Sequence, residues 1–455
     1  MVAEYDVITV GGGLAGAALA KVLAERGVRV LVFEREIAFR DRIRGEQMHP
    51  WGVAEARKLG LYELFLGTCS SEVRYWSGQL VGFSDVSRRD LFETSPHRAG
   101  SLNVYHPDMQ SVVIAAAEKA GATVLRGARV LGVLAETPPS VRVRLDANGE
   151  HVYRARLVVG ADGRSSMARQ WGGFSVEHDP AGMTIAGLRI DGLAAPEDTM
   201  NGFVHPDYGM LSLTVPLGKG RFRVYVGRHK RDGVPTERPW SGKNAIADFI
   251  SANIAAGAPA PWYASNFRVT GPLASYESAD HWVNHPHKAG IVLVGDAAAS
   301  NDPCFGCGLS LTLRDVRVLS DYLLTDSDWS AGADAYAKEH DRHYRSIHRM
   351  TSWLRYMLYD PSREAIEVRA RALPRVIADR ARFPDVIGVG PDFPPMKFTG
   401  GVFSAKIELS ASWAVIRRVL RMAAMGASGR VPAAEAERAR YRFSLRTFVR
   451  TPGNR

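Results

Sequence analysis

The sequence predicts an α/β fold: a domain built on a parallel sheet, with an inserted antiparallel sheet and a helical C-terminal region. Three observations lead to this prediction. An apolar strand near the N-terminus runs directly into a glycine-rich turn and a helix, two distant apolar strands each end in an aspartate, and the interval between these two strands alternates as antiparallel strands do. With 455 residues, 46% of them hydrophobic, the chain can bury two or three cores.

The N-terminal segment combines the strand 5–10 with the pattern Gly-x-Gly-x-x-Gly. Gly11 permits the tight turn, Gly13 lets the backbone approach a pyrophosphate, and Gly16 lets the following helix pack closely on the sheet. We expect that helix at about residues 15–26, with its N-terminal amides presented to a phosphate.

The second strand of this unit completes a dinucleotide-binding pattern. It covers residues 28–33 and ends at Glu34, 18 residues after Gly16. A carboxylate at this position accepts hydrogen bonds from the hydroxyls of an adenosine ribose. The N-terminus therefore predicts a Rossmann-like unit, which by itself does not distinguish FAD from NAD.

Two distant segments provide the distinction. Residues 157–169 form an apolar strand that opens into Asp162-Gly163 and the start of a helix, and residues 291–298 form another strand that ends in Gly295-Asp296. In this order and at these separations, the three motifs resemble the single-component, NAD(P)H-dependent FAD monooxygenases of the p-hydroxybenzoate hydroxylase type, which are related to the flavin-dependent halogenases. The resemblance covers about residues 1–350.

The resemblance implies a set of FAD contacts at matching positions. Glu34 matches the ribose-binding acid, Asp296 the acid at the ribityl chain, and Asp162 the acid near the pyrophosphate and the nicotinamide. Gln110 is expected to open a helix over 110–120, and Val130 to contact adenine through its backbone. The predicted cofactor-binding residues are Gly11, Gly13, Leu14, Ala15, Gly16, Glu34, Arg35, Arg44, Gln110, Val130, Asp162, Asp296, Pro303, Gly308 and Leu309.

The segment after Asp296 is expected to place a helix N-terminus at the flavin. Residues 301–308 are rich in glycine and contain Pro303, which indicates an irregular turn, and 309–324 has apolar residues at helical spacing. The partial positive charge of that helix end would stabilise an anionic reduced flavin. Cys307 and Ser310 depart from the family pattern of glutamine and asparagine, and His106 stands where relatives often have arginine.

The positions of the motifs predict a discontinuous FAD-binding domain. It covers residues 1–75, 100–175 and 285–385, and a substrate domain covers 176–284. Within the latter, 211–215 and 221–226 read as an antiparallel hairpin. Residues 386–455 form a basic C-terminal region.

The predicted function is that of an FAD-dependent monooxygenase. The resemblance implies that NAD(P)H and O₂ are used to hydroxylate or epoxidise an electron-rich, aromatic small molecule through a C4a-hydroperoxyflavin. Alternatives are a flavin-dependent halogenase, an isoprenoid reductase of the same fold, and a flavoprotein that acts as a scaffold through its basic tail. Against the halogenase, the only lysine between Lys21 and Lys119 is Lys58, in a predicted surface helix. No catalytic side chain is identified.

A pair of cysteines and a cluster of histidines could each indicate a metal or redox site. Cys304 and Cys307 form a Cys-x-x-Cys pair, a pattern typical of a redox disulfide or of half a zinc site. The only further cysteine is Cys69, so four thiolate ligands for zinc are impossible. Three cysteines in 455 residues fit a reducing cytoplasm. Glu339, His340, His343 and His348 are interpreted as a solvated helix face, and no metal ligand is predicted.

The net charge of +10 is concentrated at the C-terminus. Residues 411–455 contain ten arginines and no lysines against two glutamates. We expect a helix docked on the main body there, in preference to a membrane contact. Without an apolar stretch of membrane-spanning length or a cleavable signal, the expected location is the cytoplasm. The expected partners are the small-molecule substrate and O₂, with no nucleic acid.

Overall fold

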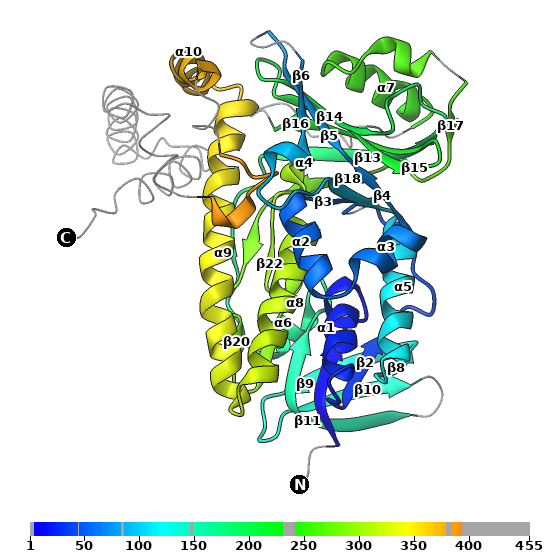
Figure 1. Cartoon of the computed structure of the whole chain (residues 1–455), viewed down its shortest axis with the longest axis vertical. Coiled ribbons are helices and arrows are strands. Elements are labelled where there is room, and N and C mark those ends of the chain that lie inside the picture. Colours follow the sequence, from blue (N-terminus) through cyan, green and yellow to red (C-terminus); the bar gives the residue numbers. More distant parts are fainter. Residues whose placement is uncertain are drawn as a thin grey trace, which may run out of the picture.

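The computed structural model describes residues 4–43, 45–82, 86–145, 149–230, 240, 242–264, 266–378 and 384–393. Figure 1 shows a parallel-sheet body at one end, a second sheet at the other end, and a long helix, α9 (Trp329–Leu358), along one side. The mixed α/β architecture agrees with the predicted fold class.

The first sheet is mostly parallel, and the N-terminal strand β1 lies in its interior. β1 pairs in parallel with β2 on one side and with β11 on the other, and β8 and β21 extend the sheet in the same direction. The order is β20 (His287–Lys288), β21 (Ile291–Leu293), β11 (Glu150–Gly160), β1 (Tyr5–Val10), β2 (Val30–Glu34) and β8 (Thr123–Arg126). The hairpin expected around Gly149 is formed by β10 (Ser140–Leu145) and β11, and β9 (Ala128–Leu134) pairs with β10.

Both faces of this sheet are buried because its side chains alternate between two cores. Val7 and its neighbours on one face pack against the helices α1 (Leu14–Ala24), α5 (His106–Lys119) and α8 (Gly308–Thr325). Ile8 and its neighbours on the other face join the core under β9, β10 and the short helix α6 (Met167–Trp171). Two covered faces are the condition under which parallel strands are stable.

The helix boundaries confirm two predictions and correct one. α1 and α8 begin and end close to the predicted limits of 15–26 and 309–324. α5 begins at His106, so Gln110 is not its first residue. Pro107 lies in the first turn of α5, where its missing N–H costs nothing, and this signal marks the start that the prediction missed.

The second sheet is antiparallel except for one pair. The predicted hairpin is formed by β15 and β16, with Leu213 opposite Tyr225. β5 and β6 also belong to this sheet, although they precede the interval 176–284, and β5 pairs in parallel with β14. The order is β17 (Arg268–Val269), β13 (Met183–Asp191), β16 (Arg221–His229), β15 (Met210–Gly218), β14 (Thr199–His205), β5 (Tyr75–Leu80) and β6 (Ser87–Asp90), with β18 (Ala274–Ser278) beside β13.

The other α-helices and strands are arranged around and between the two sheets. The remaining helices are α2 (Pro50–Lys58), α3 (Tyr62–Thr68), α4 (Leu91–Thr94), α7 (Ala245–Ala255) and α10 (Arg363–Ala378). The remaining strands are β3 (Gln47–Met48), β4 (Ser70–Val73), β7 (Ser101–Val104), β12 (Glu177–His178), β19 (His281–Trp282) and β22 (Ala299–Ser300). The basic tail predicted at 411–455 lies outside the described residues.

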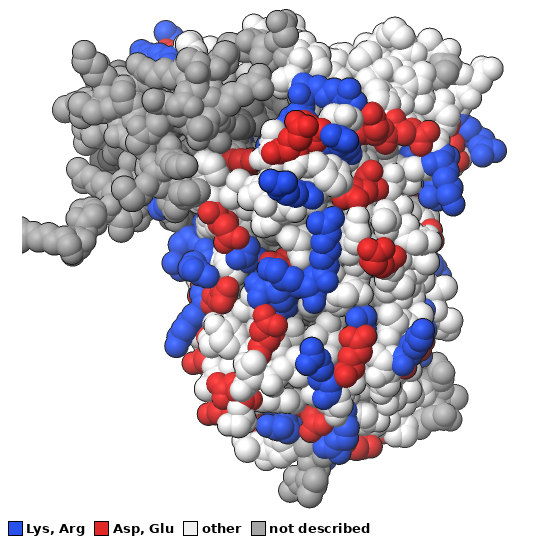
Figure 2. Space-filling model, viewed as in Figure 1, with Lys and Arg blue, Asp and Glu red and all other residues white. Residues whose placement is uncertain are grey.

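The described surface mixes charges of both signs. In Figure 2, basic and acidic side chains lie next to one another across the described part of this face. Pairs such as Arg317 with Glu55 and with Asp321 account for this arrangement around α2 and α8. Among the described helices, none has the length and hydropathy needed to cross a bilayer.

The contact between α2 and α8 yields a stability prediction. A Cβ added at Gly52 would overlap the Ser310 hydroxyl and lie 2.8 Å from the Ser310 Cα, whereas a Cβ at Gly67 in α3 meets nothing within 4 Å. Gly52→Ala should therefore destabilise the protein by about 1–3 kcal/mol through overpacking. Gly67→Ala should be neutral or stabilise by up to about 1 kcal/mol, since alanine is the better helix former. Urea unfolding of both variants checks this, and equal stability of the two would contradict it.

Candidate functional site: the carboxyl edge of the parallel sheet

The predicted cofactor residues follow the carboxyl ends of four neighbouring parallel strands. β1 ends before Gly11, β2 ends at Glu34, β11 ends before Asp162, and β21 ends before Asp296. The chain leaves β1 toward β2 while β11 pairs on its other side, so the edge above β1 is a topological switch point of the sheet. Crevices at such points are where open α/β sheets bind ligands.

The glycine-rich turn is held by close backbone contacts. Gly11 has φ +103°, and a Cβ there would lie 2.5 Å from the carbonyl oxygen of Ala161. A Cβ on Gly16 would overlap the carbonyl oxygen of Gly11. At Gly13, the Gln110 amide nitrogen, 3.4 Å from the Cβ position, is the one atom of the described residues found within 4 Å. The packing therefore leaves no room for a side chain at Gly11 or Gly16. Gln110, another predicted cofactor contact, lies beside the same turn.

Glu34 lies on the same turn. Its Oε2 accepts a hydrogen bond of 2.8 Å from the Gly12 N–H, and its Oε1 accepts one of 2.8 Å from the Glu36 N–H. The side chain is buried. The next residue, Arg35, is exposed and lies 3.6 Å from the Glu36 carboxylate. The carboxylate is therefore fixed at the end of β2, where it also has acceptor capacity for a ribose hydroxyl.

Asp162 serves the start of α6. Its Oδ2 accepts hydrogen bonds of 2.7 and 3.0 Å from the Met167 and Ala168 N–H groups, and its Oδ1 accepts one from the Ser166 hydroxyl. Both oxygens thus bind the N-terminus of a helix, a favourable place for a negative charge. This geometry gives Asp162 a structural role besides the one that the resemblance implies.

Arg169 connects Asp162 with the Asp296 segment, and sequence reasoning missed it. Its guanidinium donates to the carbonyl oxygens of Arg164 (2.9 Å) and Ala297 (3.4 Å). Burial lowers the pKa of Arg169, and the nearby carboxylates of Asp162 and Asp296 oppose that shift. The only sequence signal was its place in the helix that follows the Asp162-Gly163 turn.

Asp296 lies at the N-terminus of α8. Its Oδ1 is 4.0 Å from the position of a Cβ on Gly308, the first residue of that helix. The preceding Gly295 packs on Thr312 of α8 and on Ala15 of α1, and its N–H donates to Asp315 over 3.0 Å. The glycine-rich turn, Asp296 and the start of α8 therefore meet at one place.

The turn 302–307 is built to expose the backbone of α8. Asp302 accepts a hydrogen bond of 3.0 Å from the Cys304 N–H, and Gly306 has a left-handed φ of +65°. His49 contacts the Phe305 carbonyl oxygen over 2.6 Å, and burial lowers the pKa of His49 to about 4, so this imidazole stays neutral. The side chain of Cys307, the N-cap residue of α8, makes no hydrogen bond to the first N–H groups of this helix.

The remaining predicted contacts are more scattered. Val130 lies in β9, half-buried, opposite Val143, and its side chain packs on the core under the sheet. His106, at the first position of α5, contacts the Gly45 carbonyl oxygen over 3.2 Å, and Leu309 lies beside Gly45. Arg44, between Ile43 and Gly45, lies outside the described residues.

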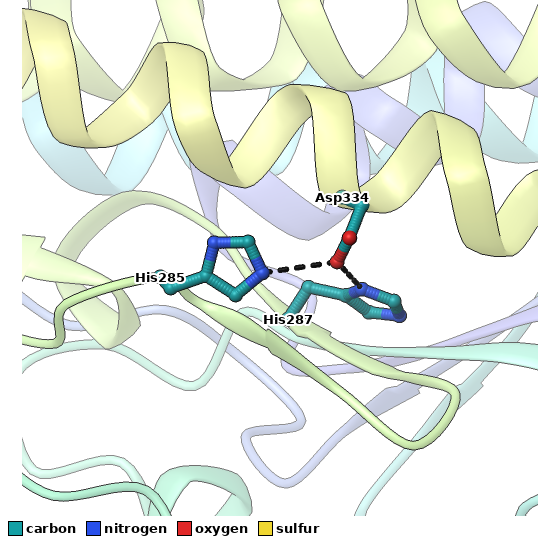
Figure 3. Close-up of side chains that lie close together, drawn as sticks. All are labelled: His285, His287 and Asp334. Atoms are coloured by element: carbon teal, nitrogen blue, oxygen red, sulfur yellow. Dashed lines mark hydrogen bonds and ion pairs between the residues drawn. The ribbon is translucent and has the colours of Figure 1, made fainter.

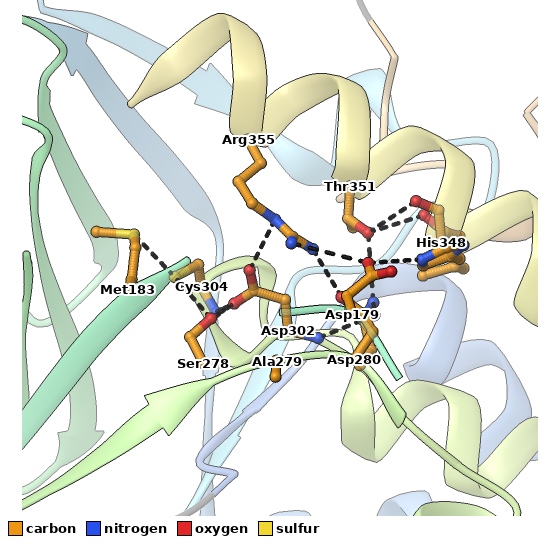
Figure 4. A network of polar contacts seen from close by, with 12 residues as sticks. Asp179, Met183, Ser278, Ala279, Asp280, Asp302, Cys304, His348, Thr351 and Arg355 are labelled. Carbon is orange, nitrogen blue, oxygen red and sulfur yellow. Dashed lines mark hydrogen bonds and ion pairs between the residues drawn. The ribbon is translucent and has the colours of Figure 1, made fainter. Parts of the chain in front are cut away.

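A buried polar network supports the turn 302–307 from behind (Figure 4). Arg355 of α9 lies 2.6 Å from Asp280, 3.1 Å from Asp302 and 3.9 Å from Asp179. Asp302 also accepts from the Ser278 hydroxyl, and His348 lies 2.9 Å from Asp179. All of these carboxylates are nearly inaccessible. Arg355 therefore connects α9 to the residue that shapes the turn.

The histidines of α9 correct one prediction. His340, His343 and His348 were predicted on a solvated face, but all three are buried, each beside a carboxylate. His340 lies 2.8 Å from Asp315, on α8. The helix is inserted between α8 and the connecting strands, which periodicity alone could not reveal because histidine and glutamate are polar at both buried and exposed positions.

The cysteines of the turn are free, buried thiols. Burial raises the pKa of both Cys304 and Cys307, and Cys304 lies close to Asp302, which adds to the shift. A thiolate is the reactive form, so these side chains are packing groups at neutral pH. Ser310, the other departure, accepts the His49 N–H over 3.0 Å and fills the space beside Gly52.

The second sheet contacts Asp41, Ile43 and Glu46, which lie beside the carboxyl edge. Arg223 of β16 lies 3.0 Å from Glu46 and 2.7 Å from Asp41, and Tyr225 donates to Glu46. Burial raises the pKa of Glu46, although the Arg223 charge opposes that shift. Ile43 and Cys304 share an apolar cluster with residues of this sheet, including Met183, Ile185, Leu211 and Tyr225.

The comparisons with known proteins identify the family. Residues 4–349 match the family described as FAD binding domain. The chain belongs to this family. It is 27% identical to rifampicin monooxygenase from Streptomyces venezuelae over 84% of this chain and 76% of that protein. It is 25% identical to digeranylgeranylglycerophospholipid reductase 1 from Methanococcoides burtonii over 68% of this chain and 71% of that protein. The protein is thus an oxidoreductase of the FAD-dependent monooxygenase family.

A solved structure has the same fold. The structure of p-nitrophenol 4-monooxygenase from Pseudomonas putida superposes with a TM-score of 0.69 at 19% identity, over 82% of this chain and 93% of that one. The carboxyl edge fits FAD on its own geometry, because there is space beside Gly13 in the glycine-rich turn and the Cys307 side chain takes none of the first N–H groups of α8. The residues that would hold FAD are those gathered at this edge.

The pair His348–Asp179 predicts a pH-dependent contribution to stability. Burial lowers the pKa of His348, but the hydrogen bond to Asp179 and the nearby Asp280 outweigh it, so the folded pKa is raised above 6.5. A raised folded pKa gives stability that is fully present below about pH 6.5 and is lost as the pH rises through the folded pKa. The His348→Gln variant should therefore be less stable than the wild type at low pH, and this difference in stability should decrease as the pH rises.

Thermal unfolding between about pH 5.5 and 9 measures this difference, around the unperturbed histidine pKa of about 6.5. Burial lowers the pKa of His340, but Asp315 outweighs it and raises that pKa. His340 is present in both proteins, so its titration cancels in the comparison. His151→Gln, at a partly exposed histidine on β11 away from this cluster, is the control and should leave the curve unchanged. A deficit of His348→Gln that is constant with pH would contradict the assignment.

Proposed function

We propose that this protein uses NAD(P)H and O₂ to hydroxylate or epoxidise an electron-rich, aromatic small molecule. The observation that carries the proposal is the meeting of the cofactor edge with the second sheet. Ile43 and Cys304 are the sequence neighbours of two predicted FAD contacts, Arg44 and Pro303. Both pack in one cluster with Tyr225 and other residues of that sheet. A substrate between the flavin and this sheet would meet apolar and aromatic groups.

The chain's own residues would hold FAD along the carboxyl edge. The turn 11–16 and the start of α1 would receive the pyrophosphate, Glu34 the adenosine ribose, and Asp296 the ribityl chain. The bound flavin supplies the redox chemistry and the reaction with oxygen. The first N–H groups of α8, at Gly308 and Leu309, would carry partial positive charge toward the flavin pyrimidine and favour its anionic reduced form.

Residues 41–46 connect this cofactor position to the substrate side. Glu46 and Asp41 both bind Arg223, whose side chain is fully buried on β16. Gly45, between them, lies beside His106 at the start of α5 and Leu309 at the start of α8. We therefore assign Arg223 a positioning role, through which a substrate on the second sheet would influence the flavin-contacting segment.

The proposal that NAD(P)H is the electron donor rests on the resemblance of the three motifs. Asp162 already binds the N-terminus of α6, so we place the nicotinamide near Asp162 and Arg169 without assigning the Asp162 carboxylate a direct contact.

The halogenase alternative would need a suitably placed lysine. Lys58 is exposed on α2 and lies 3.8 Å from Glu55, and Lys21 is buried against Glu25. Neither lysine supports halogenation.

The first test is cofactor retention. Asp296→Ala removes an acceptor at the ribityl position and should weaken FAD binding by about 1–3 kcal/mol. Asp321→Ala, which removes an exposed carboxylate elsewhere on α8, should bind FAD as the wild type does. Fluorescence titration of the apoprotein with FAD measures both affinities. Wild-type affinity in Asp296→Ala would remove Asp296 from the proposed site.

The second test is reduction without a partner protein. Mixing the yellow protein anaerobically with NADH or NADPH should bleach the flavin absorbance, faster when an aromatic substrate is present. Admission of ¹⁸O₂ should then place one labelled oxygen atom in the product. If neither nicotinamide bleaches the flavin across a panel of phenolic and polycyclic compounds, but a separate flavin reductase does, the single-component assignment is wrong.

A further inference from the structure

Two histidines and an aspartate meet at one oxygen atom beside α9. His285 Nε2 and His287 Nδ1 each lie 2.9 Å from Asp334 Oδ1. His285 lies two residues before the edge strand β20, His287 is the first residue of that strand, and Asp334 lies in the second turn of α9 (Figure 3). None of the three belongs to the carboxyl edge or to its supporting network.

The donor set is that of a transition-metal site. Imidazole nitrogen and carboxylate oxygen are preferred ligands of zinc and nickel, and three protein ligands with an open position are a common arrangement for zinc. One donor atom from each residue lies within 4.8 Å of the others. The His287 side chain is 6% exposed, whereas those of His285 and Asp334 are 40% and 48% exposed. An ion could thus enter from solvent while one ligand stays fixed in the interior.

The backbone holds His285 in an uncommon conformation. Its φ is +56°, in the left-handed region that non-glycine residues seldom adopt. Its N–H donates to Asp341 of α9 over 2.9 Å, and its carbonyl oxygen accepts from the His287 N–H over 2.8 Å. Strain of this kind persists where the surroundings require a particular side-chain direction, and it is concentrated at binding sites. Here it directs the imidazole at Asp334.

A second cluster with metal-ligand chemistry already contains a cation. Asp179, Asp280 and His348 also bring donor atoms within 4.8 Å of one another, but the Arg355 guanidinium lies 2.6 Å from Asp280 inside that cluster. At His285, His287 and Asp334, by contrast, the two imidazoles themselves face the carboxylate. A divalent ion there would replace two N–H···O contacts with three coordinate bonds.

We propose that His285, His287 and Asp334 bind a divalent transition-metal ion of the zinc or nickel type, which fastens α9 to the edge of the parallel sheet. The sequence analysis predicted no metal ligand, since the histidines and Asp334 are 47 residues or more apart. This role does not depend on the proposed reaction, because Asp334 lies near the N-terminal end of α9, whereas Arg355, which contacts Asp302 of the turn 302–307, lies near its C-terminal end.

The experiment titrates tag-free, FAD-loaded protein, first stripped with a chelator, with Zn²⁺ in a calorimeter. We expect one equivalent to bind and the thermal midpoint to rise with it. Asp334→Asn and His287→Ala should each weaken binding at least about tenfold, the scale of losses seen even for second-shell changes. His178→Ala, which removes an exposed histidine outside the cluster, should bind as the wild type does.

A third variant separates metal binding from folding. His285→Gly removes a ligand but suits the positive φ, so the metal-free protein should fold with its stability kept or raised. It should nonetheless lose the tight Zn²⁺ site and the metal-dependent rise in thermal midpoint. Co²⁺ should give visible d–d absorption beyond the flavin bands in the wild type and in His178→Ala, but not in His285→Gly. Absence of stoichiometric binding, or binding that survives in His285→Gly and Asp334→Asn, would overturn the proposal.

Discussion

The parallel pairing of β1 with β2 on one side and with β11 on the other is the constraint on which the rest of this structure depends. It makes the chain reverse its direction of winding at β1, and it brings the ends of four strands to one edge. The close approach of Gly11 to Ala161 and of Gly16 to Gly11 is possible only without side chains. The same contacts that pack α1 on the sheet thus leave an open backbone where a pyrophosphate is expected.

The edge is completed from the far side by α9, which packs on α8 and carries Arg355 and His348. Three buried carboxylates around one guanidinium are costly to desolvate, and such a group is a weak source of stability. Its geometry has a clear consequence, however, because Asp302 is held between Arg355 and the Cys304 N–H. The position of the turn before α8 is therefore set by a helix that begins 22 residues after the end of that turn.

A second connection joins the edge to the antiparallel sheet. Arg223 holds Asp41 and Glu46 on either side of the segment that passes α5 and α8. Apolar contacts of Ile43 and Cys304 with the same sheet accompany this pair. The two sheets are thus in contact through the residues that are expected to face the flavin, which is the arrangement needed for a substrate on one sheet to affect a cofactor on the other.

The sequence by itself determined the local units: the strand, glycine turn and helix of 5–24, the acids Glu34, Asp162 and Asp296 at strand ends, the hairpin of β15 and β16, and the course of α8. These depend on short-range periodicity and on the conformational demands of glycine, which are legible in consecutive residues. The start of α5 was missed by four residues, and the burial of His340, His343 and His348 was predicted wrongly. Only the tertiary structure decided that Asp162 binds the start of α6, that Arg355 and Arg223 hold segments more than fifty residues away, and that His285, His287 and Asp334 converge. Such pairings arise when distant elements pack, and a polar side chain gives no sign in its own sequence neighbourhood of whether its partner will be water or another residue.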